Sequence, residues 1–220
     1  MRSCESLNLS IDQRPVLTNI SCTIKSGEIV IVCGDHESGK SALLQALAGN
    51  IQACRSQVLH QGQALVATPA QVVLAQRPAP PSDQTVSDVI EAWDNVAEFA
   101  VQGLWQRPIK TLSRGERRWV ELAQVWAQIR QQSEISSLFL DEPLQGLDQH
   151  KRALILDLIN QSKSKGMAVL IALNDLAVAK QIADQVLLLK SGHLLAQGPP
   201  DQVLTPTLLQ AAFETDVRLG

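Results

Sequence analysis

One short segment combines the residue types that bind phosphate at the spacing that such binding requires. It reads Gly34-Asp35-His36-Glu37-Ser38-Gly39-Lys40-Ser41, which fits the pattern G-x-x-x-x-G-K-[ST]. Backbone N–H groups of such a loop, together with the first turn of the helix that follows, converge on phosphate oxygens. Lys40 would neutralise charge on the β- and γ-phosphates, and the Ser41 hydroxyl would ligate Mg²⁺. The segment therefore predicts a nucleoside triphosphate site.

Two acids, Asp141 and Glu142, follow the apolar run Leu138-Phe139-Leu140. A hydrophobic strand that ends in this way would place Asp141 beside Mg²⁺ and leave Glu142 to polarise an attacking water. On its own, such a pair is more often a solvated strand end. Combined with the phosphate loop, it predicts hydrolysis of the nucleotide.

Buried strands are the elements that must bring the loop and the acids together. The loop follows Glu28–Cys33, a continuously apolar and β-branched run that precedes an expected helix at 42–48. Segments 72–75, 137–140 and 168–173 have the same character. Runs of this kind are typical of strands buried on both faces of a mainly parallel sheet. Helical segments separate them, so we predict an α/β core with right-handed crossovers.

The remaining segments predict additions to this core. Alternating apolar residues near the start indicate an antiparallel β layer: Leu7, Leu9, Ile11, Ile20, Cys22 and Ile24. Apolar residues recur at helical spacing over 85–101 and again over 114–130, and a hairpin is expected at 186–196. We predict one domain over 1–220, with a core and β layer formed by 1–76 and 131–220 and an inserted, shortened helical lobe at 77–130.

Composition excludes several classes of protein. The net charge of −3 comes without a basic block, so nucleic acid is not an expected partner. The longest apolar run, Met167–Leu173, is too short to span a bilayer, and no secretory signal is recognisable, so we expect a cytoplasmic location. The cysteines show no metal-ligand spacing and are expected to be reduced and mostly buried: Cys4, Cys22, Cys33 and Cys54.

A third motif, Leu112-Ser113-Arg114-Gly115-Glu116, narrows the class of nucleotide hydrolase. Here the chain resembles the ATP-binding subunits of ABC transporters, whose signature is L-S-G-G-Q followed by a basic helix. Further matches occur in the expected order and extend the resemblance over nearly the whole chain: Gln76 after a strand, Gly146-Leu147-Asp148 after the acids, and Leu173-Asn174-Asp175 after the last parallel strand.

The resemblance implies a head-to-tail homodimer that closes on ATP and Mg²⁺. Ser113, Arg114 and Gly115 of one subunit would meet the γ-phosphate bound by the other, and Asp148 would belong to the same nucleotide-binding set. Gln76 would sense Mg²⁺ and the γ-phosphate. Hydrolysis at Glu142 would open the dimer, and the lobe would pass the movement to transmembrane permease subunits. The subunit would then lie peripherally on the inner face of the membrane and serve a periplasmic substrate-binding protein indirectly.

The tail from Gln197 to Val217 is similar to the end of ATPases that serve iron-siderophore, hemin and vitamin B12 importers. Gln76-Arg77 and the segment 122–128 are particularly similar to the hemin importer members. The resemblance thus implies a subunit that powers import of hemin or of a related iron chelate or corrinoid. The cargo itself stays open, because it never contacts this subunit.

Several residues depart from the family pattern. Ile11 replaces the aromatic that stacks on adenine, Glu37 replaces a loop glycine, Arg114 replaces the first signature glycine, Glu116 replaces the glutamine, and Asn174 replaces the switch histidine. We expect weaker base binding and slower turnover. These departures leave open a nucleotide-binding coupling subunit with little turnover. The short length of the chain also fits the ATPase of a heme exporter used in cytochrome c maturation, although the tail is more similar to importers.

Overall fold

The computed structural model describes residues 1–51, 57–60, 62–64, 71–74, 83–90 and 93–213. Three predictions fall outside these ranges: the roles of Gln76 and Arg77, the state of Cys54, and the tail beyond Phe213.

The central sheet has six strands in the order β10-β9-β3-β8-β7-β6. These are β3 (Ile29–Gly34), β6 (Gln71–Leu74), β7 (Ser137–Asp141), β8 (Ala168–Ala172), β9 (Gln185–Lys190) and β10 (His193–Gly198). All neighbouring pairs run parallel except β9 and β10, which form the predicted hairpin. Every residue of β3, β7 and β8 is buried, which fits their unbroken apolar sequences. The predicted α/β core is confirmed.

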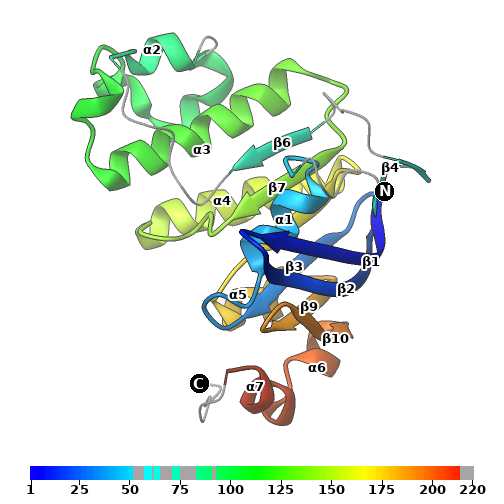
Figure 1. Ribbon diagram of the computed structural model, residues 1–220. Helices are drawn as coiled ribbons and strands as arrows, with labels where there is room; N and C mark the ends of the chain where they lie inside the picture. Colours follow the sequence, from blue (N-terminus) through cyan, green and yellow to red (C-terminus); the bar gives the residue numbers. More distant parts are fainter. Residues whose placement is uncertain (52–56, 61, 65–70, 75–82, 91–92, 214–220) are drawn as a thin grey trace.

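A second, antiparallel sheet covers one face of the first, as the alternating N-terminal sequence predicts. It consists of β1 (Arg2–Ile11), β2 (Arg14–Ile24), β4 (Val58–His60) and β5 (Gln63–Ala64), in the order β2-β1-β4-β5. Helix α1 (Lys40–Leu47) lies between the two sheets, where Leu43 and Leu47 share a core with Leu7, Ile20 and Val32 (Figure 1). The thiols of Cys4, Cys22 and Cys33 are free and buried.

The segment 85–101 is helical in part but is not one helix, so that prediction was wrong in its extent. Helix α2 covers only Val86–Val89, and 3-10 segments η2 (Trp93–Phe99) and η3 (Val101–Leu104) follow. The backbone leaves helical geometry at Val96 (φ −136°, ψ 30°) and at Ala100 (φ 49°). Val96 and Phe99 are buried in the core shared with the long helix α3 (Arg114–Gln131). Burial of these side chains overrides their helical spacing.

The helical lobe and the central sheet share one hydrophobic core. Val86, Phe99 and Trp126 of the lobe belong to the same buried cluster as Leu138 and Leu140 of β7. The Trp119 indole of α3 donates a hydrogen bond to the Phe99 carbonyl at 2.7 Å. In Figure 1, α2 and α3 lie at the end of the molecule opposite α6 and α7.

The 3-10 segment η4 (Ile109–Thr111) directly precedes α3. The remaining helices follow strands of the central sheet or end the described chain: α4 (Gln149–Ser164), α5 (Leu176–Ile182), α6 (Pro200–Val203) and α7 (Pro206–Phe213). Helices α4 and α5 contribute Ile155, Ile159 and Ile182 to the core on the face of the central sheet away from α1. Within the described residues, no helix is both long enough and apolar enough to cross a membrane.

The turn between β9 and β10 supports the phosphate loop. Gly192 has a left-handed φ of 79° and a Cβ there would lie 2.4 Å from the Val16 carbonyl oxygen. Its N–H donates to the Ser38 carbonyl at 3.1 Å, and its own carbonyl accepts from Thr18 N–H at 2.9 Å. One glycine thus joins the hairpin to β2 and to the loop at residues 34–41.

Gly192→Ala is expected to lower the free energy of unfolding by roughly 2 to 4 kcal/mol, because left-handed strain adds to a backbone clash. Gly166→Ala is the matched control, since Gly166 has a similar φ of 83° but open space around it. Strain alone should cost this control about 1 kcal/mol. Urea unfolding of both variants measures the difference, and equal losses would show that the contact with Val16 does not matter.

Candidate nucleotide-binding site

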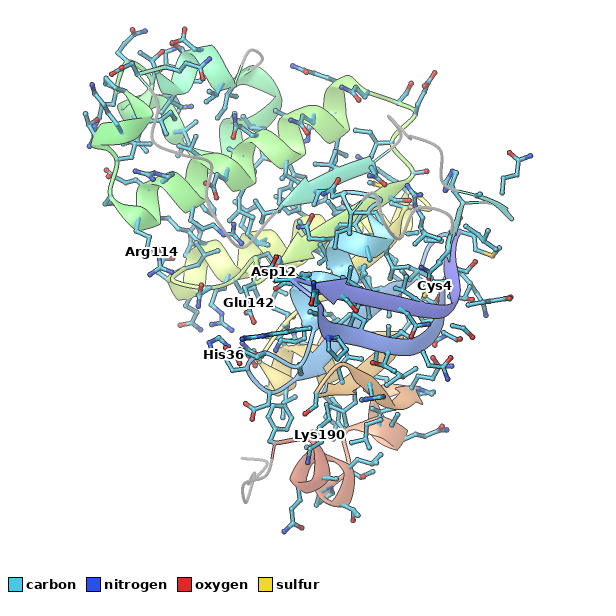
Figure 2. All side chains as sticks on the ribbon, viewed as in Figure 1. Cys4, Asp12, His36, Arg114, Glu142 and Lys190 are labelled. Atoms are coloured by element: carbon cyan, nitrogen blue, oxygen red, sulfur yellow. The ribbon has the colours of Figure 1, made fainter. Side chains whose placement is uncertain are left out.

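A cleft of about 590 Å³ opens at the carboxyl ends of β3, β7 and β8. Ligands of open parallel sheets commonly bind at this edge. Its walls come from four separate parts of the chain: Ile11, Val16, His36, Glu37, Ser38, Gly39, Lys40, Ser41, Ala42, Asp141, Glu142 and Asn174. The structure therefore brings most of the predicted loop together with both acids and with Asn174. In Figure 2, His36 and Glu142 lie on the same side of the molecule as Asp12, at the tip of the β1–β2 hairpin.

The phosphate loop connects β3 directly to α1, as its sequence predicts. Gly39 precedes the helix with a left-handed φ of 102°, and a Cβ there would lie 2.8 Å from a Leu17 methyl and 3.1 Å from the Val16 carbonyl oxygen. Only glycine fits this position without strain. The close approach of β2 therefore fixes the path of the loop and the point at which α1 begins.

Lys40 is the buried cation of the cleft. Its ammonium donates hydrogen bonds to the carbonyl oxygens of Gly34 at 2.9 Å and Asp35 at 2.7 Å. Burial lowers the pKa of Lys40, while the nearby charge of Glu142 acts in the opposite direction. The ammonium is thus held at the loop by neutral carbonyls, which an anionic phosphate can replace as stronger acceptors.

Asp141 and Glu142 are buried at the end of β7, with exposed fractions of 2% and 8%. The Glu142 N–H donates to the Ala172 carbonyl at 2.9 Å, and Glu142 itself has a left-handed φ of 47°. Its Oε1 atom finds no hydrogen-bond partner among the described residues. Burial raises the pKa of Glu142, and the positive charge of Lys40 opposes this shift. Glu142 lines the cleft, and a carboxylate in that place is suited to accept a hydrogen bond or a proton from a water molecule.

The oxygen donors of Ser41 and Asp141 fit Mg²⁺. Both side chains line the cleft, and a hydroxyl with a carboxylate is the hard donor set that this ion prefers. Within the described residues, no group of three His, Cys, Asp or Glu side chains could hold a metal ion by itself. Such a site therefore suits an ion that takes its remaining ligands from phosphate and water. Gln76, the third predicted ligand, lies outside the described residues.

Three of the departures from the family pattern line the cleft: Ile11, Glu37 and Asn174. Asn174 follows β8 and precedes α5, whose first turn is capped by the Asp175 carboxylate, which accepts from the Val178 N–H at 3.1 Å. Arg152 of α4 donates to the same carboxylate. Ile11 is 49% exposed at the end of β1 and provides apolar surface beside Val16.

Other predicted site residues lie outside this cleft. Ser113, Arg114 and Gly115 are exposed at the start of α3, and Figure 2 shows Arg114 at the surface. The Ser113 hydroxyl accepts from the Glu116 N–H at 3.2 Å, and the Glu116 carboxylate accepts from the Ser113 N–H at 2.8 Å. This capping box explains why a glutamate suits that position.

Asp148 is likewise exposed and caps α4, accepting from the Lys151 N–H at 2.9 Å. The sequence interpretation assigned Asp148 to the nucleotide site. In one chain it lies apart from the cleft residues, like the turn at Ser113.

Sequence reasoning missed two residues at this site. Val16 lines the cleft from β2, and Arg118 of α3 donates hydrogen bonds to the backbone carbonyls of Asp141 and Glu142. Neither had a usable signal, because one is an ordinary strand residue and the other is part of a basic run on a helix.

Comparisons with known proteins agree with this geometry. Residues 17–145 match the family model described as ABC transporter. The chain is 32% identical to the hemin import ATP-binding protein HmuV of Streptomyces coelicolor over 97% of its own length and 83% of that protein. It is also 32% identical to HmuV of Pseudomonas entomophila, over 99% and 94% of the two chains.

Solved structures show the same fold. The ATP-binding subunit of an ABC transporter superposes with a TM-score of 0.81 at 20% identity, covering 96% of this chain and 95% of that one. An ATP-binding cassette of an ABC transporter in its ADP conformation gives a TM-score of 0.77 at 18% identity, covering 96% and 97%.

Proposed function

The chain belongs to the ABC transporter family, whose ATP-binding subunits hydrolyse ATP, and we propose that it powers import of hemin or of a related iron chelate or corrinoid. The observation that carries the ATPase assignment is the convergence of Lys40, Ser41, Asp141 and Glu142 on one cleft. Support for the cargo comes from the relatives, which are named hemin import ATP-binding proteins.

We assign phosphate binding to residues 34–41. The Lys40 ammonium, now bonded to two loop carbonyls, would turn to the β- and γ-phosphates while loop N–H groups bind the remaining oxygens. The base would lie toward Ile11 and Val16, which offer apolar contact and no aromatic ring. We therefore expect the phosphates to provide most of the ATP affinity.

The Ser41 hydroxyl and the Asp141 carboxylate would hold Mg²⁺. When bound, the ion neutralises charge that develops on the phosphates during transfer. Gln76 stays in the proposed set as a further ligand.

Glu142 is our proposed general base. Its carboxylate, which lines the cleft, would accept a hydrogen bond from the attacking water, and the Asn174 amide would hold a γ-phosphate oxygen.

Assembly is proposed from the exposed motifs. Ser113, Arg114, Gly115 and Asp148 lie outside the cleft of their own chain, which supports a head-to-tail homodimer in which they contact the partner's nucleotide. Permease subunits follow from the family. We propose that they hold this chain at the inner face of the membrane and that a periplasmic substrate-binding protein delivers the cargo to them.

The cargo and the direction of transport can be tested together. The permease that copurifies with this chain would be reconstituted in proteoliposomes with the ATPase site outside, and hemin would be supplied on either side. ATP-dependent movement of hemin toward the ATPase side supports import. Movement away from that side would favour the exporter alternative. No movement of hemin would exclude hemin as the cargo, and the same assay with an iron chelate and a corrinoid would then test the rest of the proposal.

One substitution tests whether Asn174 is the cause of the slow turnover that the coupling-subunit alternative supposes. If Asn174 limits turnover, Asn174→His should raise kcat roughly tenfold, because an imidazole can orient water and, when protonated, match developing charge. ATP affinity should change less, since the amide already binds ground-state phosphate. Steady-state phosphate release and nucleotide titration measure the two quantities. An unchanged kcat would show that Asn174 does not limit turnover and would point to Arg114 or Ile11 as the cause.

A further inference from the structure

Arg118 connects the helix that begins at the signature turn to the two acids of the cleft. It lies in the second turn of α3, and its guanidinium donates hydrogen bonds to the backbone carbonyls of both Asp141 and Glu142, the latter at 3.1 Å. An ion pair with Glu121 at 3.3 Å holds the same guanidinium, and both side chains are largely buried, at 12% and 14% exposure.

The two carbonyls belong to successive residues, and a planar guanidinium can donate to both at once. This matters because Glu142 has a left-handed φ of 47°, a conformation that costs a non-glycine residue free energy and persists only where neighbouring contacts enforce it. Charged donors on both carbonyls are such contacts. Besides Arg118, the Glu142 N–H bond to Ala172 fixes the same turn from β8.

We propose that Arg118 is a positioning residue that holds the Glu142 carboxylate in the cleft and ties its placement to helix α3. The inference rests on the proposed role of Glu142 in hydrolysis and deepens it. Arg118 does not line the cleft, so it acts through the backbone of the acids and not on the nucleotide.

The same contact makes hydrolysis sensitive to the position of the lobe. Ser113, which caps helix α3, lies on the exposed turn that we expect to contact the partner's nucleotide, and Arg118 follows within the same helix. A shift of α3 moves the donor of both carbonyl bonds. The Arg118 side chain thereby links closure of the dimer to the orientation of the Glu142 carboxylate.

The test compares three single variants of the full chain. Arg118→Met should lower kcat for ATP hydrolysis by roughly ten- to a hundredfold, as expected when a reacting group is misplaced by a fraction of an ångström to an ångström. The Kd for ATP should stay within about twofold, because Lys40 and the loop are unchanged. Arg118→Lys should recover part of kcat, since an ammonium can still donate to a carbonyl.

Arg130→Met is the matched control, because Arg130 lies on the same helix and bonds a carboxylate of the lobe, that of Glu98. It should keep the wild-type kcat. Thermal unfolding shows whether Arg118→Met is folded. If it is not, kcat and the Kd for ATP are compared between Arg118→Lys and wild type instead. Wild-type kcat in Arg118→Met, or an equal fall in kcat and in ATP affinity, overturns the proposal.

A double-mutant cycle with Glu142→Gln separates this inference from the proposed function. If Arg118 acts through Glu142, adding Arg118→Met to Glu142→Gln should lower residual turnover by less than about twofold. A full additional loss would show that Arg118 acts elsewhere and would overturn the inference alone. Wild-type turnover in Glu142→Gln would instead overturn the proposed role of Glu142, and the inference with it.

Discussion

Glu142→Gln is expected to lower ATP turnover by two to four orders of magnitude while ATP still binds. The amide keeps the size of the side chain but cannot accept a proton from water, and general-base catalysis typically contributes about 10²- to 10⁴-fold. Lys40 and the loop are untouched, so the Kd for ATP should change little. Phosphate release and titration with a fluorescent ATP analogue measure the two effects.

The same variant should also accumulate as an ATP-bound dimer. Nucleotide that bridges two subunits stays intact in Glu142→Gln and keeps shifting the equilibrium toward the assembled form. Sedimentation with and without Mg-ATP detects this. A variant that stays monomeric at saturating ATP would point to obstruction by the exposed Arg114, and Arg114→Gly should then restore the dimer.

Lys40→Ala is expected to weaken ATP binding by about a hundredfold or more, because the loop loses its one buried ammonium. The change also leaves the carbonyls of Gly34 and Asp35 without the donor they have now. ATP should raise the melting temperature of the wild-type protein and fail to do so in the variant.

Lys25→Ala is the control for this experiment, since Lys25 is exposed directly after β2 and does not line the cleft. It should keep the full ATP-dependent rise in melting temperature. Equal protection of Lys40→Ala and wild type would remove the phosphate-loop assignment.

The parts of the fold that sequence predicted well are those governed by short-range pattern. The unbroken apolar run before Gly34 identified a strand buried on both faces, and the glycine-lysine spacing placed the start of α1 within two residues. Because parallel strands end at one edge of a sheet, Asp141 and Asn174 could be expected beside that loop without knowledge of the packing.

Tertiary contacts decided the parts that sequence did not reveal. The segment 85–101 has helical spacing, yet its backbone leaves helical geometry at Val96, and Val96 and Phe99 are buried in the core shared with α3. In the sequence, Arg118 is one member of a basic run. Its two carbonyl partners are apparent only in the structure, where α3 approaches the end of β7. Spacing along the chain contains no information about either contact.

Phosphate release by the purified wild-type protein is the most direct test of the central claim, which is that this cleft hydrolyses ATP. With Mg-ATP bound to saturation, as judged by titration, we predict steady release that depends hyperbolically on ATP concentration and is about a hundredfold or more slower in Glu142→Gln. ATP binding with release no faster than in Glu142→Gln, for the chain alone and with its permease, would contradict hydrolysis and identify a coupling subunit instead.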